Sequence, residues 1–129
     1  IEIAHAPIFG VNRSGEIDLW NNMSAETLGF SKDLVLGKSL VEFFIDPASR
    51  QSVRAVVDQA LAGNSTANYE LEIETKAGQV RYLLANVSSR PNSSGDVIGV
   101  VVFAQDVTES GQNDRAVAGI ARELRQLLD

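Results

Sequence analysis

Two hydrophobic periods divide the chain into strand-like and helix-like stretches. The clearest strand signal is 69–74, where apolar and acidic residues alternate strictly, as they do on a sheet with one buried face. Alternating or short apolar runs bounded by turn residues predict four further strands. These lie at 7–11, 16–20, 79–89 and 96–105.

Helical signals fill the stretch between the second and third strands. Short helices are predicted at 23–28, 32–36 and 40–45, the first two ending at glycines. A longer helix opens at Asp46-Pro47, where proline costs no hydrogen bond, and ends at Gly63. Its apolar face recurs every three or four residues, at Val53, Val56, Val57, Ala60 and Leu61. This order predicts an α+β fold, a five-stranded antiparallel sheet with helices gathered over one face.

Past Thr108 the hydrophobic period becomes that of a helix. Its stripe consists of Val117, Ile120, Leu124 and Leu127, which has heptad character. Because two heptads alone are marginal in water, we expect the stripe to pack on the sheet or on a second copy. We predict one domain at 1–110 and a linker or signalling helix at 111–129. The chain begins at Ile1 without a signal-like segment, so we expect a piece of a longer protein.

Composition excludes several classes of function. The net charge is −6 and the basic residues are scattered, which argues against nucleic acid as a partner. Cysteine is absent and His5 is the single histidine, which removes thiol chemistry and His-cluster metal sites. The longest apolar run, 97–104, has strand length, so no membrane span is expected. A reducing cytoplasm is compatible with these features and is the expected location.

An ordered set of short motifs resembles the PAS superfamily, a large class of sensory and interaction domains. The matching motifs are Ala6-Pro7-Ile8-Phe9, Asp18-Leu19-Trp20-Asn21-Asn22, 25–31, Leu36-Gly37-Lys38, Ala62-Gly63, Lys76-Ala77-Gly78, Gly99-Val100-Val101 and Asp106-Val107-Thr108-Glu109. The sequence looks most like the PAS repeats of plant-type phytochromes and tandem-PAS signalling proteins. The resemblance implies the PAS fold and neighbouring repeats or an output domain in the parent chain.

The resemblance also lets the known PAS cofactors be tested residue by residue. LOV photosensors carry an asparagine and a reactive cysteine where this chain has Ser39 and Leu40, so no flavin adduct can form. Their flavin-contacting polar residues fall on Ile73, Leu83 and Ala104, which would leave the flavin's polar edge unbonded. The haem-binding type needs a histidine on the long helix, and 46–63 contains none. Bilin attachment uses a cysteine in a different domain. We therefore expect no cofactor, although a small apolar ligand stays open.

The residues predicted to face inward form a packed core or, as the alternative, a small apolar pocket. They are Ile8, Leu28, Phe43, Val56, Leu71, Ile73, Leu83, Ala85, Val87, Val100, Val102 and Ala104. Arg81 is the only basic candidate for the ligand space. The favoured interpretation makes it an edge arginine that pairs with a glutamate of 70–74 across the hairpin.

The junction Asp106-Val107-Thr108 is, by the resemblance, the point where the last strand passes a change to the exit helix. We expect Asp106 to pair at the sheet edge, Val107 to enter the core and Thr108 to cap the helix. Four residues on the outward face of the last two strands, Tyr82, Leu84, Val101 and Phe103, need cover. We expect the exit helix or a homodimer partner to provide it.

Two functions remain open at this point. One is a sensory or relay module upstream of a histidine kinase or cyclic-nucleotide enzyme, as in two-component systems. The other is a ligand-free dimerisation or scaffold module. An enzyme is not expected, because no nucleophile–base pair is evident and Glu70, Glu72 and Glu74 form a solvated row.

Overall fold

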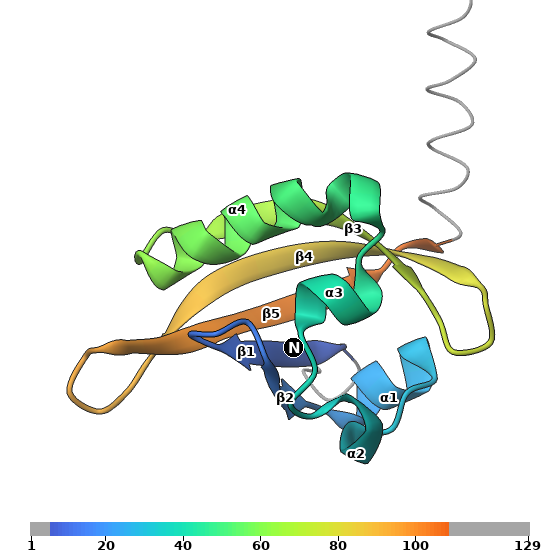
Figure 1. Cartoon of the computed structure of the whole chain (residues 1–129), viewed down its shortest axis with the longest axis horizontal. Coiled ribbons are helices and arrows are strands. Elements are labelled where there is room, and N and C mark those ends of the chain that lie inside the picture. The colour runs from blue at the N-terminus through green and yellow to red at the C-terminus, as the bar shows by residue number, and fades with distance from the viewer. Residues whose placement is uncertain (1–5, 109–129) are drawn as a thin grey trace, which may run out of the picture.

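A single antiparallel sheet organises the molecule, whose computed structural model describes residues 6–108. Its five strands lie in the order β2-β1-β5-β4-β3, so that the first and last strands in the sequence meet at the centre (Figure 1). The strands are β1 (Ile8–Asn12), β2 (Ile17–Trp20), β3 (Thr66–Glu74), β4 (Val80–Pro91) and β5 (Val97–Asp106). Because β5 pairs with both β1 and β4, a displacement of β5 affects both halves of the sheet.

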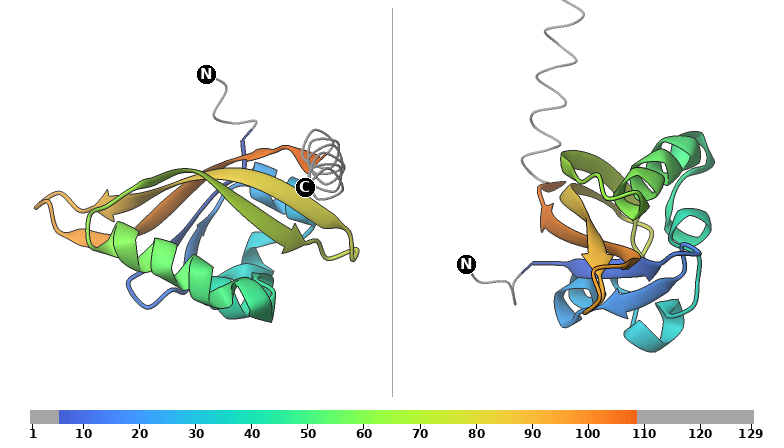
Figure 2. Two further views of the ribbon diagram at one scale, coloured as in Figure 1. Left: turned by 90° about the horizontal axis from the view of Figure 1, so that it is seen from above. Right: turned by 90° about the vertical axis from the view of Figure 1, so that its left-hand side faces the viewer.

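The helices lie between β2 and β3 in the chain and are gathered toward one side of the sheet (Figure 2). They are α1 (Asn22–Leu28), α2 (Lys32–Val35), α3 (Leu40–Phe44), the 3₁₀ turn η2 (Pro47–Ser49) and α4 (Arg50–Leu61). Asn21 begins α1 by accepting the N–H of Ser24 at 2.9 Å, and it also accepts the N–H of Ile8. This one side chain therefore ties the first helix to the first strand.

The hydrophobic core lies between α4, α3 and the covered face of the sheet. On the helical side Val53, Val57 and Ala60 of α4 are buried, as their spacing predicts. The covered face of the sheet contributes alternate residues of each strand, namely Phe9, Val11, Leu71, Ile73, Leu83, Ala85, Val87, Val100, Val102 and Ala104. The predicted α+β fold with a five-stranded antiparallel sheet is confirmed.

The element boundaries differ from the sequence prediction at both ends of the long hairpins. β3 begins at Thr66 and not at 69, and β4 continues through Arg90 and Pro91, which the sequence assigned to a loop. The opening of the long helix is the separate 3₁₀ turn at Pro47–Ser49. Ser31 precedes α2 as predicted but makes no side-chain capping bond. The predicted exit helix lies outside the described residues.

Candidate functional site

The junction after β5 is held to the start of β4 by a short series of hydrogen bonds. The N–H of Val107 donates to the carbonyl of Tyr82 at 2.8 Å, and the N–H of Tyr82 donates to the hydroxyl of Thr108 at 3.1 Å. The Thr108 hydroxyl in turn donates to a carboxylate oxygen of Asp106. Asp106 also accepts the N–H of Thr108 at 3.0 Å. The three junction residues are therefore bonded to one another and to Tyr82, and we call this set of contacts, together with the Arg81–Asp106 pair described next, the clasp.

Arg81 completes the clasp from the neighbouring position on β4. Its Nη1 lies 3.5 Å from Oδ2 of Asp106, and the two side chains are 36% and 29% exposed. Arg81 is opposite Ile73 and two residues before Leu83, which places it on the helix-covered face at the end of the sheet. From the sequence, a glutamate of 70–74 was the expected partner of Arg81. The pairing with Asp106 depends on β4 and β5 being neighbours, a relation that spacing along the chain does not reveal.

The predicted roles of the other two junction residues are modified by this geometry. Val107 is half-buried and contributes through its backbone N–H. Thr108 uses its hydroxyl to bond β4, and any cap on the following helix lies outside the described residues. It is Asp106 that accepts a backbone N–H past the strand, that of Thr108.

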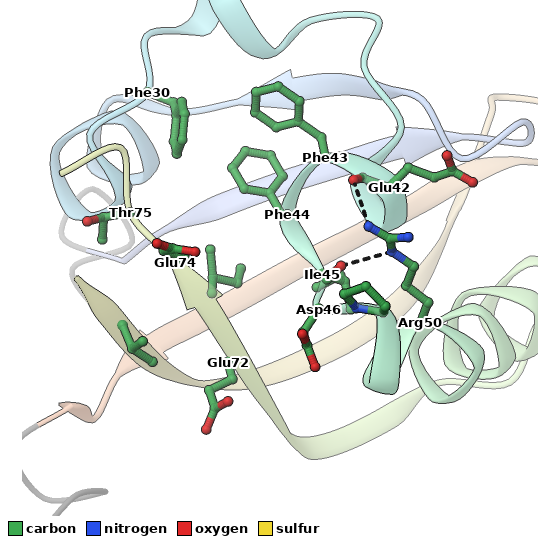
Figure 3. A pocket seen from close by; sticks show the side chains of 13 residues that line it. Phe30, Glu42, Phe43, Phe44, Ile45, Asp46, Arg50, Glu72, Glu74 and Thr75 are labelled. Carbon is green, nitrogen blue, oxygen red and sulfur yellow. Dashed lines mark hydrogen bonds between the residues drawn. The ribbon is translucent and has the colours of Figure 1, made fainter. Parts of the chain in front are cut away.

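A surface cavity of about 460 Å³ opens between α3 and the end of β3, next to this junction (Figure 3). Phe30, Phe43 and Phe44 form its aromatic wall, with ring centroids 4.8 to 5.5 Å apart and edge-to-face geometry. Arg50 forms another part of the wall, where its guanidinium donates to the carbonyls of Ile45 at 3.0 Å and Glu42 at 3.4 Å. The remaining lining residues are Asp46, Pro47, Glu72, Ile73, Glu74, Thr75 and Val80.

The cavity and the junction meet on three consecutive residues of β4. Val80 lines the cavity and is 43% exposed. Arg81 follows it and pairs with Asp106, and Tyr82 comes next and bonds Val107 and Thr108. A change at Val80 is therefore one or two residues, a few ångström along a strand, from the bonds that hold the junction.

Most of the residues predicted to face inward are buried, and three are placed differently. Ile8 alternates with the buried Phe9 and Val11 and so lies on the opposite face, where it pairs with Phe103. Phe43 is 40% exposed at the cavity mouth, and Val56 is half-buried at the edge of the core. The buried members are Leu28, Leu71, Ile73, Leu83, Ala85, Val87, Val100, Val102 and Ala104. They form a continuous packed cluster, and their role in ligand binding stays a prediction.

The outer face of the sheet carries the predicted docking residues. Tyr82, Leu84 and Val101 are half-buried there and Phe103 is 41% exposed. None of the helices between 22 and 61 covers this face (Figure 2). Its predicted partners Val117, Ile120, Leu124 and Leu127 lie outside the described residues.

A second arginine of β4, Arg90, makes a contact across the same outer face that the sequence did not predict. Its Nη2 reaches Asp18 of β2 at 2.6 Å and the carbonyl of Val11 at 3.4 Å. The guanidinium thus crosses β5 and β1, and it does so over Gly99 and Gly10. A Cβ at Gly99 would lie 2.7 Å from Nη2, and one at Gly10 would lie 3.0 Å from Nη1. Glycines inside two predicted strands were the available signal for this close approach.

Within residues 6–108 no group of three or more histidine, cysteine or acidic side chains could hold a metal ion. Within the same range no helix is long and apolar enough to cross a membrane.

Comparison with known proteins gives consistent results at the level of sequence and of fold. A family profile described as the PAS fold matches residues 1–107. Phytochrome E of Ipomoea nil is 34% identical over 113 residues, and phytochrome B1 of Solanum lycopersicum is 37% identical over 112 residues. Each alignment covers 84% of this chain and 10% of the relative. The chain thus spans about a tenth of the length of the curated relatives it matches.

A solved structure supports the fold independently of sequence. The PAS domain of a protein from Colwellia psychrerythraea superimposes with a TM-score of 0.70 at 19% identity, covering 81% of this chain and 88% of that one. At this identity the likeness speaks for the fold alone. The profile match, the phytochrome relatives and the five-stranded sheet together establish that this chain belongs to the PAS family and is homologous to the PAS repeats of phytochromes.

Proposed function

We propose that this domain is a sensory or relay module that passes a change in its packing through Asp106-Val107-Thr108 to the segment that follows. The observation that carries the proposal is the clasp of all three junction residues to β4, through Arg81 and both backbone groups of Tyr82. A shift of the start of β4 relative to β5 must therefore strain or release this clasp.

The strength of the clasp suits a switch between two arrangements. Arg81 and Asp106 are partly exposed and separated by 3.5 Å, and such pairs contribute about 0–1 kcal/mol. The hydrogen bonds of Thr108 and Val107 add about 1 kcal/mol each. The junction is thus ordered, yet a modest change in the cavity or at a dimer interface is large enough to alter it.

The chain's lack of cysteine makes a direct test possible. Spin labels on Asn64→Cys, an exposed site beyond α4, and on Gln112→Cys, beyond the junction, report the distance between the domain and the exit segment. Labelled chain is diluted with unlabelled chain so that only distances within one molecule are seen. We expect Asp106→Asn combined with Thr108→Val to shift or broaden this distance distribution.

The control for this test makes the same change of charge at a site away from the junction. Asp58→Asn neutralises an exposed carboxylate on α4 and should leave the distribution unchanged. An unaltered distribution in the junction variant would falsify the relay, because the clasp would then not set the direction of the exit segment.

The alternative function, a dimerisation or scaffold module, is favoured by the bare outer face. Phe103 is 41% exposed there, beside the half-buried Leu84 and Val101. We propose that a second copy covers this face together with the exit segments. Sedimentation of the chain should show a dimer that Phe103→Glu dissociates. A purely monomeric wild-type chain excludes this partner.

The parent protein fits the same proposal. We infer a longer signalling chain with neighbouring PAS repeats, in which this domain lies upstream of a histidine kinase or cyclic-nucleotide enzyme in the cytoplasm. What supports it is the kinship with repeats of phytochromes, of which an equivalent segment makes up about a tenth. This domain itself acts on no substrate in the proposal.

A further inference from the structure

The cavity beside the junction has the size and lining of a small-molecule site. Its volume of about 460 Å³ falls in the range of roughly 300–1,000 Å³ that is usual for ligand pockets. It opens at the surface, and of the three positions compared with LOV domains above, Ile73, Leu83 and Ala104, only Ile73 is among its lining residues. Phe43 turns its ring toward this opening and is 40% exposed (Figure 3), an uncommon position for a residue that usually lies inside.

The charges around the cavity select the sign of its ligand. Three acidic residues, Asp46, Glu72 and Glu74, belong to its lining, although the carboxylate of Glu72 points away from the aromatic wall (Figure 3). Within residues 6–108 none of the three carboxylates has an ion pair or a hydrogen bond. A fourth carboxylate, Glu42, is already neutralised by Arg54 at 2.9 Å. The one cation of the lining, Arg50, is held against backbone carbonyls. Negative charge is in excess even after Arg50 is counted, and this disfavours an anionic ligand.

A buried hydroxyl provides an independent polar contact. Thr75 lines the cavity and is only 8% exposed. Its Oγ1 accepts the N–H of Gln79 at 3.1 Å, and no described residue accepts its proton. A hydroxyl offers one donor and two lone pairs, so Thr75 retains a donor and a lone pair that a ligand can use.

From this combination we infer that the cavity binds a small organic ammonium ion with an apolar body. The apolar body would lie on Phe43 and Phe30, where a cation also gains from the faces of the rings. The ammonium N–H groups would donate to Thr75 and to the free carboxylates, which are charge-assisted bonds. Occupation displaces Val80, the residue before Arg81. This last step, and only this step, depends on the relay proposed above.

Trp20 supplies a built-in reporter of binding. It is the single tryptophan of the chain, it stacks on Phe44 at 5.4 Å, and its Nε1 donates to the carbonyl of Phe30 at 2.9 Å. Both of these partners line the cavity. A ligand that moves either of them changes the surroundings of the indole and hence its fluorescence.

The test titrates the full 129-residue chain with three probes of matched size, 2-phenylethylammonium, 2-phenylethanol and phenylacetate, following Trp20 fluorescence and calorimetry. We expect saturable binding of the ammonium ion, with the neutral alcohol weaker by about tenfold, as expected for the loss of a charge-assisted bond. Phenylacetate should not bind. Equal binding of the alcohol, or no saturable binding of the ammonium ion, overturns the inference.

Variants locate the site. The double variant Asp46→Asn with Glu74→Gln should weaken binding of the ammonium ion by about tenfold and leave the affinity for 2-phenylethanol unchanged. Phe43→Ala should weaken the binding of both probes. Asp58→Asn, an exposed carboxylate elsewhere on α4, is the matched control and should change neither. If the cavity variants bind the ammonium ion as the wild type does, the site is not this cavity.

The spin-label pair at positions 64 and 112 separates this inference from the relay. Ammonium binding that shifts the probe distance supports both. Binding without any shift keeps the cavity site and overturns its link to the junction. A junction variant that moves the probes in a chain that binds no ammonium ion keeps the relay and overturns the cavity site.

Discussion

The two arginines of β4 are used in different ways near opposite ends of the same strand. Arg90 reaches across the outer face of four strands to Asp18, at 2.6 Å, and its side chain is 22% exposed. Arg81 reaches only to the adjacent strand, where Asp106 lies 3.5 Å away, and its side chain is 36% exposed. Each has a buried Nε without a partner. One arginine therefore fastens the sheet, while the other holds the place where the chain leaves it.

The difference shows how one fold can be firm at one end and adjustable at the other. Arg90 lies flat because Gly99 and Gly10 leave room for its guanidinium against the backbone. No pair of glycines makes such room for Arg81, and its ion pair depends on the position of Asp106 in the short Asp106–Thr108 turn. The Arg90–Asp18 contact is the shorter of the two, and its arginine is the less exposed, although Asp18 at 40% is more exposed than Asp106 at 29%. A shorter charge-assisted contact contributes more and is harder to rearrange. We therefore expect mutations near Arg90 to change stability and mutations near Arg81 to change the junction.

The largest effect is expected from filling the space beside Gly99 against which the guanidinium of Arg90 lies. In Gly99→Ala the new Cβ would overlap the carbonyl oxygen of Val11 and lie 2.7 Å from Nη2 of Arg90. Since backbone atoms must move, we expect a loss of about 3 kcal/mol in the free energy of unfolding, the upper end for overpacking. Denaturant unfolding followed by Trp20 fluorescence measures it.

The control for this substitution is Gly95→Ala in the turn between β4 and β5. No atom lies within 4 Å of its Cβ site, but its φ is +86°, and the left-handed conformation should cost about 1 kcal/mol. If Gly99→Ala lowers the free energy of unfolding no more than this control does, the close approach of the Val11 carbonyl and Arg90 does not require a glycine at position 99.

A smaller effect is expected when the Arg90 contact itself is removed. Arg90→Met keeps the aliphatic stem and loses the bond to Asp18, so we expect a loss of about 1–2 kcal/mol in the free energy of unfolding. Arg54→Met breaks the exposed pair with Glu42, in which both side chains are more than half exposed. That variant should change stability by about 0.5 kcal/mol or less. Equal losses in the two variants would contradict a fastening role for Arg90.

The smallest change in stability, with the most local consequence, is expected for Arg81→Met. Its pair with Asp106 is partly exposed and 3.5 Å long, so the free energy of unfolding should fall by about 0.5 kcal/mol. Hydrogen exchange at the amides of Val107 and Tyr82 should nevertheless accelerate, by about threefold to tenfold, because local opening of the clasp becomes easier. The amide of Val102, in the middle of β5, should exchange as before. A uniform acceleration at all three amides would mean that Arg81 fastens the whole sheet as Arg90 does.

The local pattern of the sequence determined most of the fold. Strict alternation at 69–74, the three- and four-residue spacing of α4 and the turn residues between them predicted the five strands and the helices, because side-chain period reports which face is buried. The same rule misplaced Ile8, because a five-residue strand with apolar residues on both faces does not reveal its inner side. Phe43 was misplaced for a related reason, since hydrophobicity predicts burial without showing where a cavity opens.

The tertiary structure alone decided the contacts on which function is proposed. The sequence pointed to Asp106 and Thr108 but could not name Arg81 and Tyr82 as their partners, because 25 and 26 residues separate them along the chain. It also could not bring Arg90 to Asp18, or unite Phe43, Thr75 and Asp46 around one opening. Periodicity carries information about neighbours within a strand or helix, whereas these contacts depend on the strand order β2-β1-β5-β4-β3. The sequence by itself determined the elements and their buried faces, and the pairing of the strands determined which side chains can act together.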